Sequence, residues 1–145
     1  MAGKQPKRKP RPGVDEYGRT PLHYACNDGN AALCAELLAA GANPNARDDN
    51  GWAPLHFAAQ AQSPQVTSLL LNAGAETEVR DSYGNTPLGR ASMTSRGLGE
   101  VITLLRAAGA DAYAKNNSGN SPVSVARSIA NFPIAQFFAD LPADA

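Results

Sequence analysis

The residues of this 145-residue chain that are best suited to chemistry are two histidines and two cysteines, His23, His56, Cys26 and Cys34. Imidazole and thiolate groups bind metal ions, and a cysteine beside a histidine can act as a nucleophile. His23 and Cys26 are three residues apart and would share one face of a helix. A zinc site takes about four ligands, however, and only three are within reach, because a neighbouring helix would hold His56 about 8–10 Å away.

Other signatures of catalysis are also missing from the sequence. It contains no phosphate-binding P-loop, no G-x-G-x-x-G and no G-x-S-x-G motif. Cys26 and Cys34 lie in helical patterns outside any C-x-x-C pair, which predicts two buried reduced thiols. The glycine-rich "RGLG" at 96–99 is better explained as an inserted loop. The sequence therefore predicts a protein that is not an enzyme and has no catalytic residue, metal site or cofactor.

The two histidines are 33 residues apart because the whole chain repeats with that period. "GRTPLHYACNDGN" at 18–30 returns as "GWAPLHFAAQAQS" at 51–63 and as "GNTPLGRASMTSR" at 84–96. A fixed period of this length is typical of repeat proteins. The next step is 35 residues, because two residues are inserted around 95–99. The predicted organisation is a flexible basic tail at 1–14, units at 15–47, 48–80 and 81–115, a C-terminal cap at 116–141, and a short tail at 142–145.

Each unit carries the same local signals for a turn and two helices. Asp15 and Gly18 are typical of a tight turn. Thr20 can cap a helix and Pro21 is favoured at its first position, so a helix is predicted at about 20–28. A second helix is predicted at about 31–40, with leucines at helical spacing and a stop at Gly41. Such short helices are stable only when stacked on neighbouring units.

The motif at Thr20–Ala25, together with the Gly-Ala pairs at 41–42, 74–75 and 109–110, resembles the T-P-L-H-x-A signature of the ankyrin repeat family. This resemblance implies an all-α repeat solenoid, in which helix-turn-helix units are joined by β-hairpin turns and form a concave binding surface. It also implies that His23 bonds back to Thr20, a role that His56 would repeat. The last unit departs from the pattern and is predicted to close the core with Phe132, Phe137, Phe138 and Leu141.

In this family the hairpin tips and the ends of the inner helices bind partners. The corresponding candidates here are Tyr17, Arg19, Arg47, Asp49, Asn50, Trp52, Arg80, Tyr83, Asn85 and Met93. Trp52 stands out because the motif does not ask for an aromatic residue there, and Trp, Tyr and Arg are enriched in interface hot spots. The alternative for each aromatic residue is packing over the neighbouring hairpin.

Charge separates the tail from the repeats. The net charge is zero, but five basic residues and no acidic ones lie within 1–14, which leaves 8 − 13 = −5 for the rest. The tail could be a nuclear import signal, a nucleic-acid arm, an anionic-surface tether, a solvated solubilising tail, or a segment left from expression. The acidic repeats favour a basic protein partner. Their negative charge argues against binding of nucleic acid by the repeats themselves.

These observations predict a protein-binding module rather than a catalyst. One specific form is an inhibitor or immunity-type protein that covers a toxin or enzyme, and the alternative is an adaptor or regulatory subunit. No apolar run is long enough to cross a membrane, and no apolar segment follows the N-terminal charges as in a secretory signal. The expected location is the cytoplasm, or the nucleus if the tail is an import signal. The expected state in isolation is a monomer.

Overall fold

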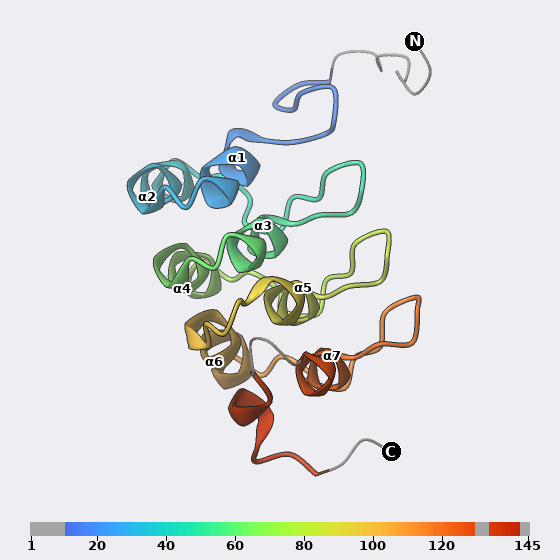
Figure 1. Ribbon diagram of the computed structural model, residues 1–145. Helices are drawn as coiled ribbons and strands as arrows, with labels where there is room; N and C mark the ends of the chain where they lie inside the picture. Colours follow the sequence, from blue (N-terminus) through green and yellow to red (C-terminus); the bar gives the residue numbers. More distant parts are fainter. Residues whose placement is uncertain (1–10, 130–133, 143–145) are drawn as a thin grey trace.

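The helices of the computed structural model, which describes residues 11–129 and 134–142, pair into a stack (Figure 1). In these ranges they are α1 Pro21–Asn27, α2 Ala31–Ala39, α3 Pro54–Gln60, α4 Pro64–Asn72, α5 Pro87–Thr94, α6 Glu100–Ala107, α7 Pro122–Ser128 and the short 3-10 helix η1 Ala135–Phe138. Helices α1, α3, α5 and α7 form one layer, α2, α4 and α6 the other, and the loops between units project to one side. This arrangement confirms the predicted all-α repeat solenoid.

In the first, third and last units the first helix starts at a polar cap residue, whereas in the second unit Ala53 makes no side-chain cap bond. The Thr20 and Thr86 hydroxyls accept hydrogen bonds from the backbone N–H of His23 and Gly89, at 3.4 and 3.2 Å. In the cap unit Ser121 accepts from Ser124 in the same way. Proline follows the cap residue in every case. A short polar side chain and a proline therefore fix the start of these helices by local chemistry alone.

The two histidines are buried and join adjacent units by hydrogen bonds. His23 Nδ1 accepts from the Thr20 N–H at 2.9 Å, and His56 Nδ1 accepts from the Ala53 N–H at 3.0 Å. Each Nε2 then donates to a carbonyl of the next unit: that of His23 to Trp52 at 3.0 Å, and that of His56 to Asn85 at 2.8 Å. The predicted bond from His23 to Thr20 is confirmed, and the link to the next unit is an addition to it.

These histidines should make the stability of the protein depend on pH. Burial lowers the pKa of both imidazoles, so the unfolded chain binds more protons than the folded one once the pH falls below the ordinary histidine pKa of about 6.5. The free energy of unfolding should therefore be greatest above that pH and fall below it, by up to about 1.4 kcal/mol per pH unit for each histidine.

Urea unfolding between pH 7.5 and 5.5 measures this effect in a window where carboxylates hardly titrate. His56→Gln removes one titrating group and should flatten the slope. The same slope in wild type and variant would contradict the proposed linkage.

The turns between units have hairpin geometry, but the described residues form no β-strand. The Asp48 carboxylate accepts from the N–H groups of Asn50 and Trp52, both at 2.9 Å, which closes the tip. Successive tips are also joined, because the Asp49 N–H donates to the Tyr17 carbonyl and the Ser82 N–H to the Asn50 carbonyl, each at 2.9 Å. These bonds hold the tips of neighbouring units in fixed register.

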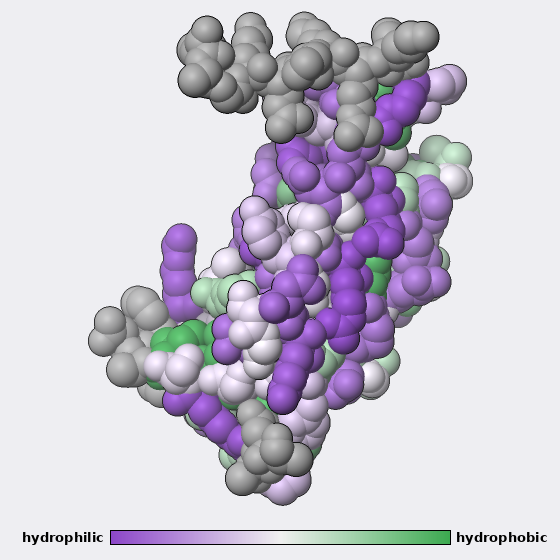
Figure 2. All heavy atoms as spheres, turned by 90° about the vertical axis from the view of Figure 1, so that its right-hand side faces the viewer, coloured by the Kyte–Doolittle hydropathy of each residue, from purple (hydrophilic) through white to green (hydrophobic). Residues whose placement is uncertain are grey.

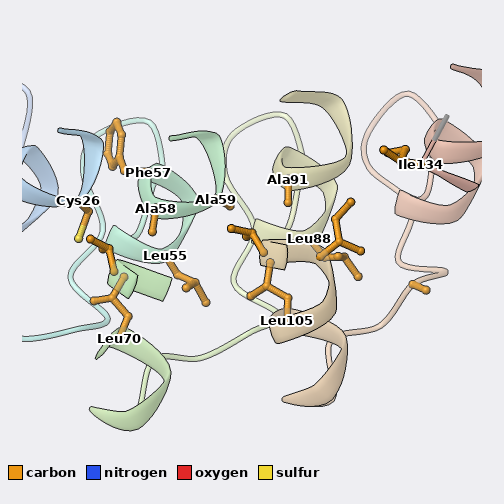
Figure 3. Close-up of a cluster of buried hydrophobic side chains, with 14 of the residues drawn as sticks. Cys26, Leu55, Phe57, Ala58, Ala59, Leu70, Leu88, Ala91, Leu105 and Ile134 are labelled. Atoms are coloured by element: carbon orange, nitrogen blue, oxygen red, sulfur yellow. The ribbon is translucent and has the colours of Figure 1, made fainter. Parts of the chain in front are cut away.

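The apolar core runs along the stack between the two helix layers (Figure 3). Leu22, Leu55 and Leu88 occupy the same position in three successive units and are all fully buried. Cys26 and Cys34 are free and buried, with their sulfur atoms 3.7 Å apart, and burial raises the pKa of both thiols. This confirms the prediction that both thiols are buried.

The C-terminal end closes the core with less structure than a full unit. Between residues 134 and 142 the chain forms the single turn of η1, which buries Phe138 completely, while Phe137 and Leu141 pack on the core in part. Phe132, the fourth predicted cap residue, lies outside the described residues, as do residues 1–10 of the basic tail. None of the helices in the described ranges combines the length and the apolar character needed to cross a bilayer.

Candidate functional site

Most of the ten candidate residues lie on or beside the projecting tips. Tyr17, Tyr83 and Met93 are 52%, 67% and 40% exposed. Exposed side chains are also found at Arg47, Asp49, Asn50 and Arg80. Arg19 and Trp52 are half-buried, and Asn85 is buried. Figure 2 looks onto the side from which the tips project, where hydrophilic residues dominate and apolar ones form separate small patches.

Six side chains from three units form a continuous stack, here called the aromatic–arginine ladder. Its members in order are Tyr24, Arg19, Phe57, Trp52, Arg90 and Tyr83. The Arg19 guanidinium carbon is 5.9 Å from the Tyr24 ring centre and 5.4 Å from that of Phe57. The Phe57 and Trp52 rings are 4.7 Å apart.

The other end of the ladder follows the same alternation. The Arg90 guanidinium carbon lies 4.5 Å above the Trp52 ring and 5.8 Å from that of Tyr83. A cation and an aromatic ring face attract each other at these distances. The ladder therefore runs across three units as one connected row of side chains, in which Phe57 is buried and joins the ladder to the core.

Two buried carboxylates hold the arginines of the ladder in place. Arg19 Nε lies 3.1 Å from Asp48 Oδ2, and Arg90 Nη2 lies 2.7 Å from Asp81 Oδ2. Neither carboxylate side chain has any exposed surface, so the pairs are shielded from solvent screening on that side. The guanidinium groups are thus fixed before any partner arrives, which reduces the entropy cost of binding.

Asn85 is the one candidate that the structure places inside rather than on the surface. It is 6% exposed, and its side-chain oxygen accepts from the Asn116 amide at 2.9 Å. Its backbone carbonyl accepts from His56. The prediction of an exposed side chain at this position was wrong, because the short amide turns toward the next tip and bonds there to the partly buried Asn116.

Arg47 and Arg80 are exposed but also join consecutive units. Arg47 donates to the carbonyl of Gly51 at 3.3 Å and to that of Arg80. Arg80 in turn donates to the carbonyls of Gly84 at 3.1 Å and Lys115 at 2.6 Å. Their guanidinium groups therefore clamp the loops beneath the tips, in addition to any contact with a partner.

Sequence reasoning did not identify Tyr24, Phe57 and Arg90 as members of this ladder. They occupy one repeat position, since they are spaced by 33 residues. A comparison of equivalent positions could have found them, because an aromatic residue in two units followed by an arginine in the third is not required by the helix. Tyr24 is 40% exposed and also donates from its hydroxyl to Asp15.

A groove lies away from the tips, between the outer helices α4 and α6. It has a volume of about 900 Å³ and is lined by apolar residues that include Leu69, Leu104 and Phe137. The Phe137 ring lies so close to Gly99 that a Cβ atom there would meet it at 2.1 Å. Within the described residues no three His, Cys, Asp or Glu side chains are placed to hold a metal ion, there or elsewhere.

The repeat geometry agrees with comparisons to known proteins. A sequence model described as ankyrin repeats, in three copies, matches residues 29–116, more than half of the chain. The chain belongs to the ankyrin repeat family. Ankyrin repeats are protein–protein interaction modules and generally act as scaffolds without catalysing a reaction.

Curated relatives match only a small part of this ankyrin repeat chain. Rabankyrin-5 from Mus musculus and Rabankyrin-5 from Homo sapiens are each 54% identical to it over 35 residues. This match covers 24% of the chain and 3% of the length of either relative. The likeness therefore extends to about one repeat.

Proposed function

We propose that this ankyrin repeat protein binds another protein along its tips and inner helices, and that it blocks a toxin or enzyme by covering it. The observation that carries this proposal is the aromatic–arginine ladder, which offers preordered Tyr, Trp and Arg side chains on one face. These residue types dominate interface hot spots. Tyr17, whose ring centre is 5.1 Å from the Arg19 guanidinium carbon, extends the same surface. Met93 on α5 is also exposed and extends it further.

The charge of the region beyond residue 14 favours a basic partner. Beyond residue 14 the sequence carries 8 basic and 13 acidic residues, a net charge of −5. Both ladder arginines are already paired with buried carboxylates, so they add little free positive charge to the face. Complementary charge accelerates encounter and suppresses wrong partners. Weaker binding at higher salt is therefore expected.

Affinity capture from the native cell tests this surface. Tyr17→Ala combined with Tyr83→Ala removes two exposed rings without opening the core, whereas Trp52 also supports Phe57 and His56. We expect this double variant to lose one protein that wild type retains, with affinity at least about tenfold lower, as for a hot-spot pair. Leu98→Ala is the control, since Leu98 is 55% exposed on the inserted loop.

The identity of the captured protein then separates the two forms of the proposal. An enzyme or toxin that loses its activity in proportion to added ankyrin protein supports the inhibitor role. A partner that stays active supports the adaptor or regulatory subunit, which is the alternative that the basic residues Lys4, Lys7, Arg8 and Lys9 favour if they direct the protein to the nucleus rather than the cytoplasm. Equal recovery of the partner by the double variant and the control would exclude the tips as the binding site.

A further inference from the structure

The second residue of each tip is acidic in the first two units only. The four units hold at this position Glu16, Asp49, Ser82 and Asn117. The turn takes its side-chain acceptor from the residue before it, as at Asp48 and Asp81. The bond to the preceding tip uses the backbone N–H, and it forms alike at Asp49, Ser82 and Asn117. Neither the turn nor the stack therefore requires a carboxylate at Asp49.

The Asp49 carboxylate binds a guanidinium group. Arg11 Nη1 and Nη2 donate to Asp49 Oδ1 and Oδ2, both at 2.9 Å, in the paired geometry that matches arginine to a carboxylate. The Asp49 side chain is 20% exposed and lies against Gly18 of the preceding tip, where an added Cβ atom would meet Asp49 Oδ1 at 2.6 Å. The neighbouring tip thus supports the carboxylate on one side, and both oxygens face the cation.

Arg11 reaches Asp49 through a turn formed by its own neighbours. Gly13 follows Pro12 and has a φ of +79°, and the Val14 N–H bonds to the Arg11 carbonyl at 3.4 Å. Proline followed by such a glycine is the pattern of a type II turn. The Arg11 side chain is 39% exposed, and exposed ion pairs are weak. A competing arginine could therefore displace Arg11 from the carboxylate.

We propose that Asp49 is a site for an arginine side chain of a basic protein partner, and that Arg11 occupies this site in the free chain. Arg19 and Arg90 are paired with carboxylates that have no exposed surface, whereas the pair at Asp49 is open to exchange. The site adjoins Tyr17, an exposed ring whose carbonyl accepts from the Asp49 N–H. The net charge of −5 beyond residue 14 favours a basic partner here. Because the site belongs to the tips, the inference rests on the proposed function.

The acetylated and amidated tetrapeptide Arg-Pro-Gly-Val, which copies residues 11–14, tests the site without the partner. Its binding to the full chain is measured by NMR titration of the amide signals of Gly18 and Asp49. We expect Arg11→Gln to bind the peptide about fivefold more tightly than wild type, because the peptide no longer has to displace an exposed ion pair. Arg96→Gln is the matched control, since it removes the same charge from an exposed position on the inserted loop and should bind as wild type does.

Two further comparisons identify the groups that bind. Adding Asp49→Asn to the Arg11→Gln chain should weaken peptide binding about fivefold. The fold should be kept, because Asn117 occupies the same place in the last tip. The peptide with lysine in place of arginine should bind more weakly, since an ammonium group lacks the planar fork that matches a carboxylate.

Any of three results would overturn the inference: equal affinity of wild type and Arg11→Gln, unchanged affinity after Asp49→Asn, or equal binding of the two peptides. Absence of peptide binding to every variant would overturn it as well. If the peptide fails while affinity capture still recovers a protein through the tips, the arginine site is wrong and the proposed function stands. If the peptide binds as expected but capture recovers nothing through the tips, the proposed function fails instead.

Discussion

Replacing Asp81 with alanine should lower the free energy of unfolding by about 3–5 kcal/mol, the range measured when one partner of a buried ion pair is removed. One oxygen of Asp81 accepts from the N–H groups of Tyr83 and Asn85, at 2.9 and 3.0 Å. The other accepts two bonds from Arg90, at 2.9 and 2.7 Å. Alanine would leave these donors without their acceptor in a place with little access to water.

The same variant should loosen the ladder. Asp81 fixes Arg90, which lies between Trp52 and Tyr83, so the loss of the carboxylate frees one end of the stack. Chemical denaturation measures the stability change, and tryptophan fluorescence reports the environment of Trp52, the only tryptophan in the chain.

Two control variants separate the turn from the ion pair. Asp81→Asn retains the turn acceptor, as Asn116 does in the last unit, where it accepts from Ser118 and Asn120. It should therefore cost less than alanine. Asp140→Asn breaks an ion pair with Arg106 whose carboxylate is 65% exposed, and exposed pairs contribute about 0–1 kcal/mol. Equal losses for Asp81→Ala and Asp140→Asn would contradict the importance of the buried pair.

The fold could be predicted from the sequence because its signals are local and repeated. Thr20 and Pro21 fix the start of α1, and Gly41 marks the end of α2, without reference to the rest of the chain. The 33-residue period then requires that the units stack. The role of His23 was also predictable, since both of its near partners lie within the same motif.

The details of the candidate site could not be predicted, because they depend on contacts between units. Arg90 looks like an ordinary polar helix residue until the stack places it above Trp52. Asn85 shares its repeat position with Arg19 and Trp52, yet it is drawn inward by Asn116 of the next tip. The partner in the next unit decides which way this position turns, and that partner is not visible within one unit.

The second large loss of stability is expected from a substitution at the C-terminal end of the stack. Phe138→Ala should lower the free energy of unfolding by about 3–5 kcal/mol, as expected for a fully buried phenylalanine. Its ring lies under the Arg106 guanidinium carbon at 5.4 Å, and Arg106 also bonds to Asp140 after η1. One side chain thus fills the end of the core and supports the ion pair that ties η1 to α6.

The loss should be concentrated at one end, because each unit of a repeat protein contacts only its neighbours. Hydrogen exchange should become faster in α7 and then in α5 and α6, while α1 and α2 keep most of their protection. Phe137→Ala is the graded control, since this ring is only half-buried and should cost less. Uniform loss of protection along the whole stack would instead mean that the four units unfold as one cooperative body, with the cap acting on the first unit as strongly as on the third.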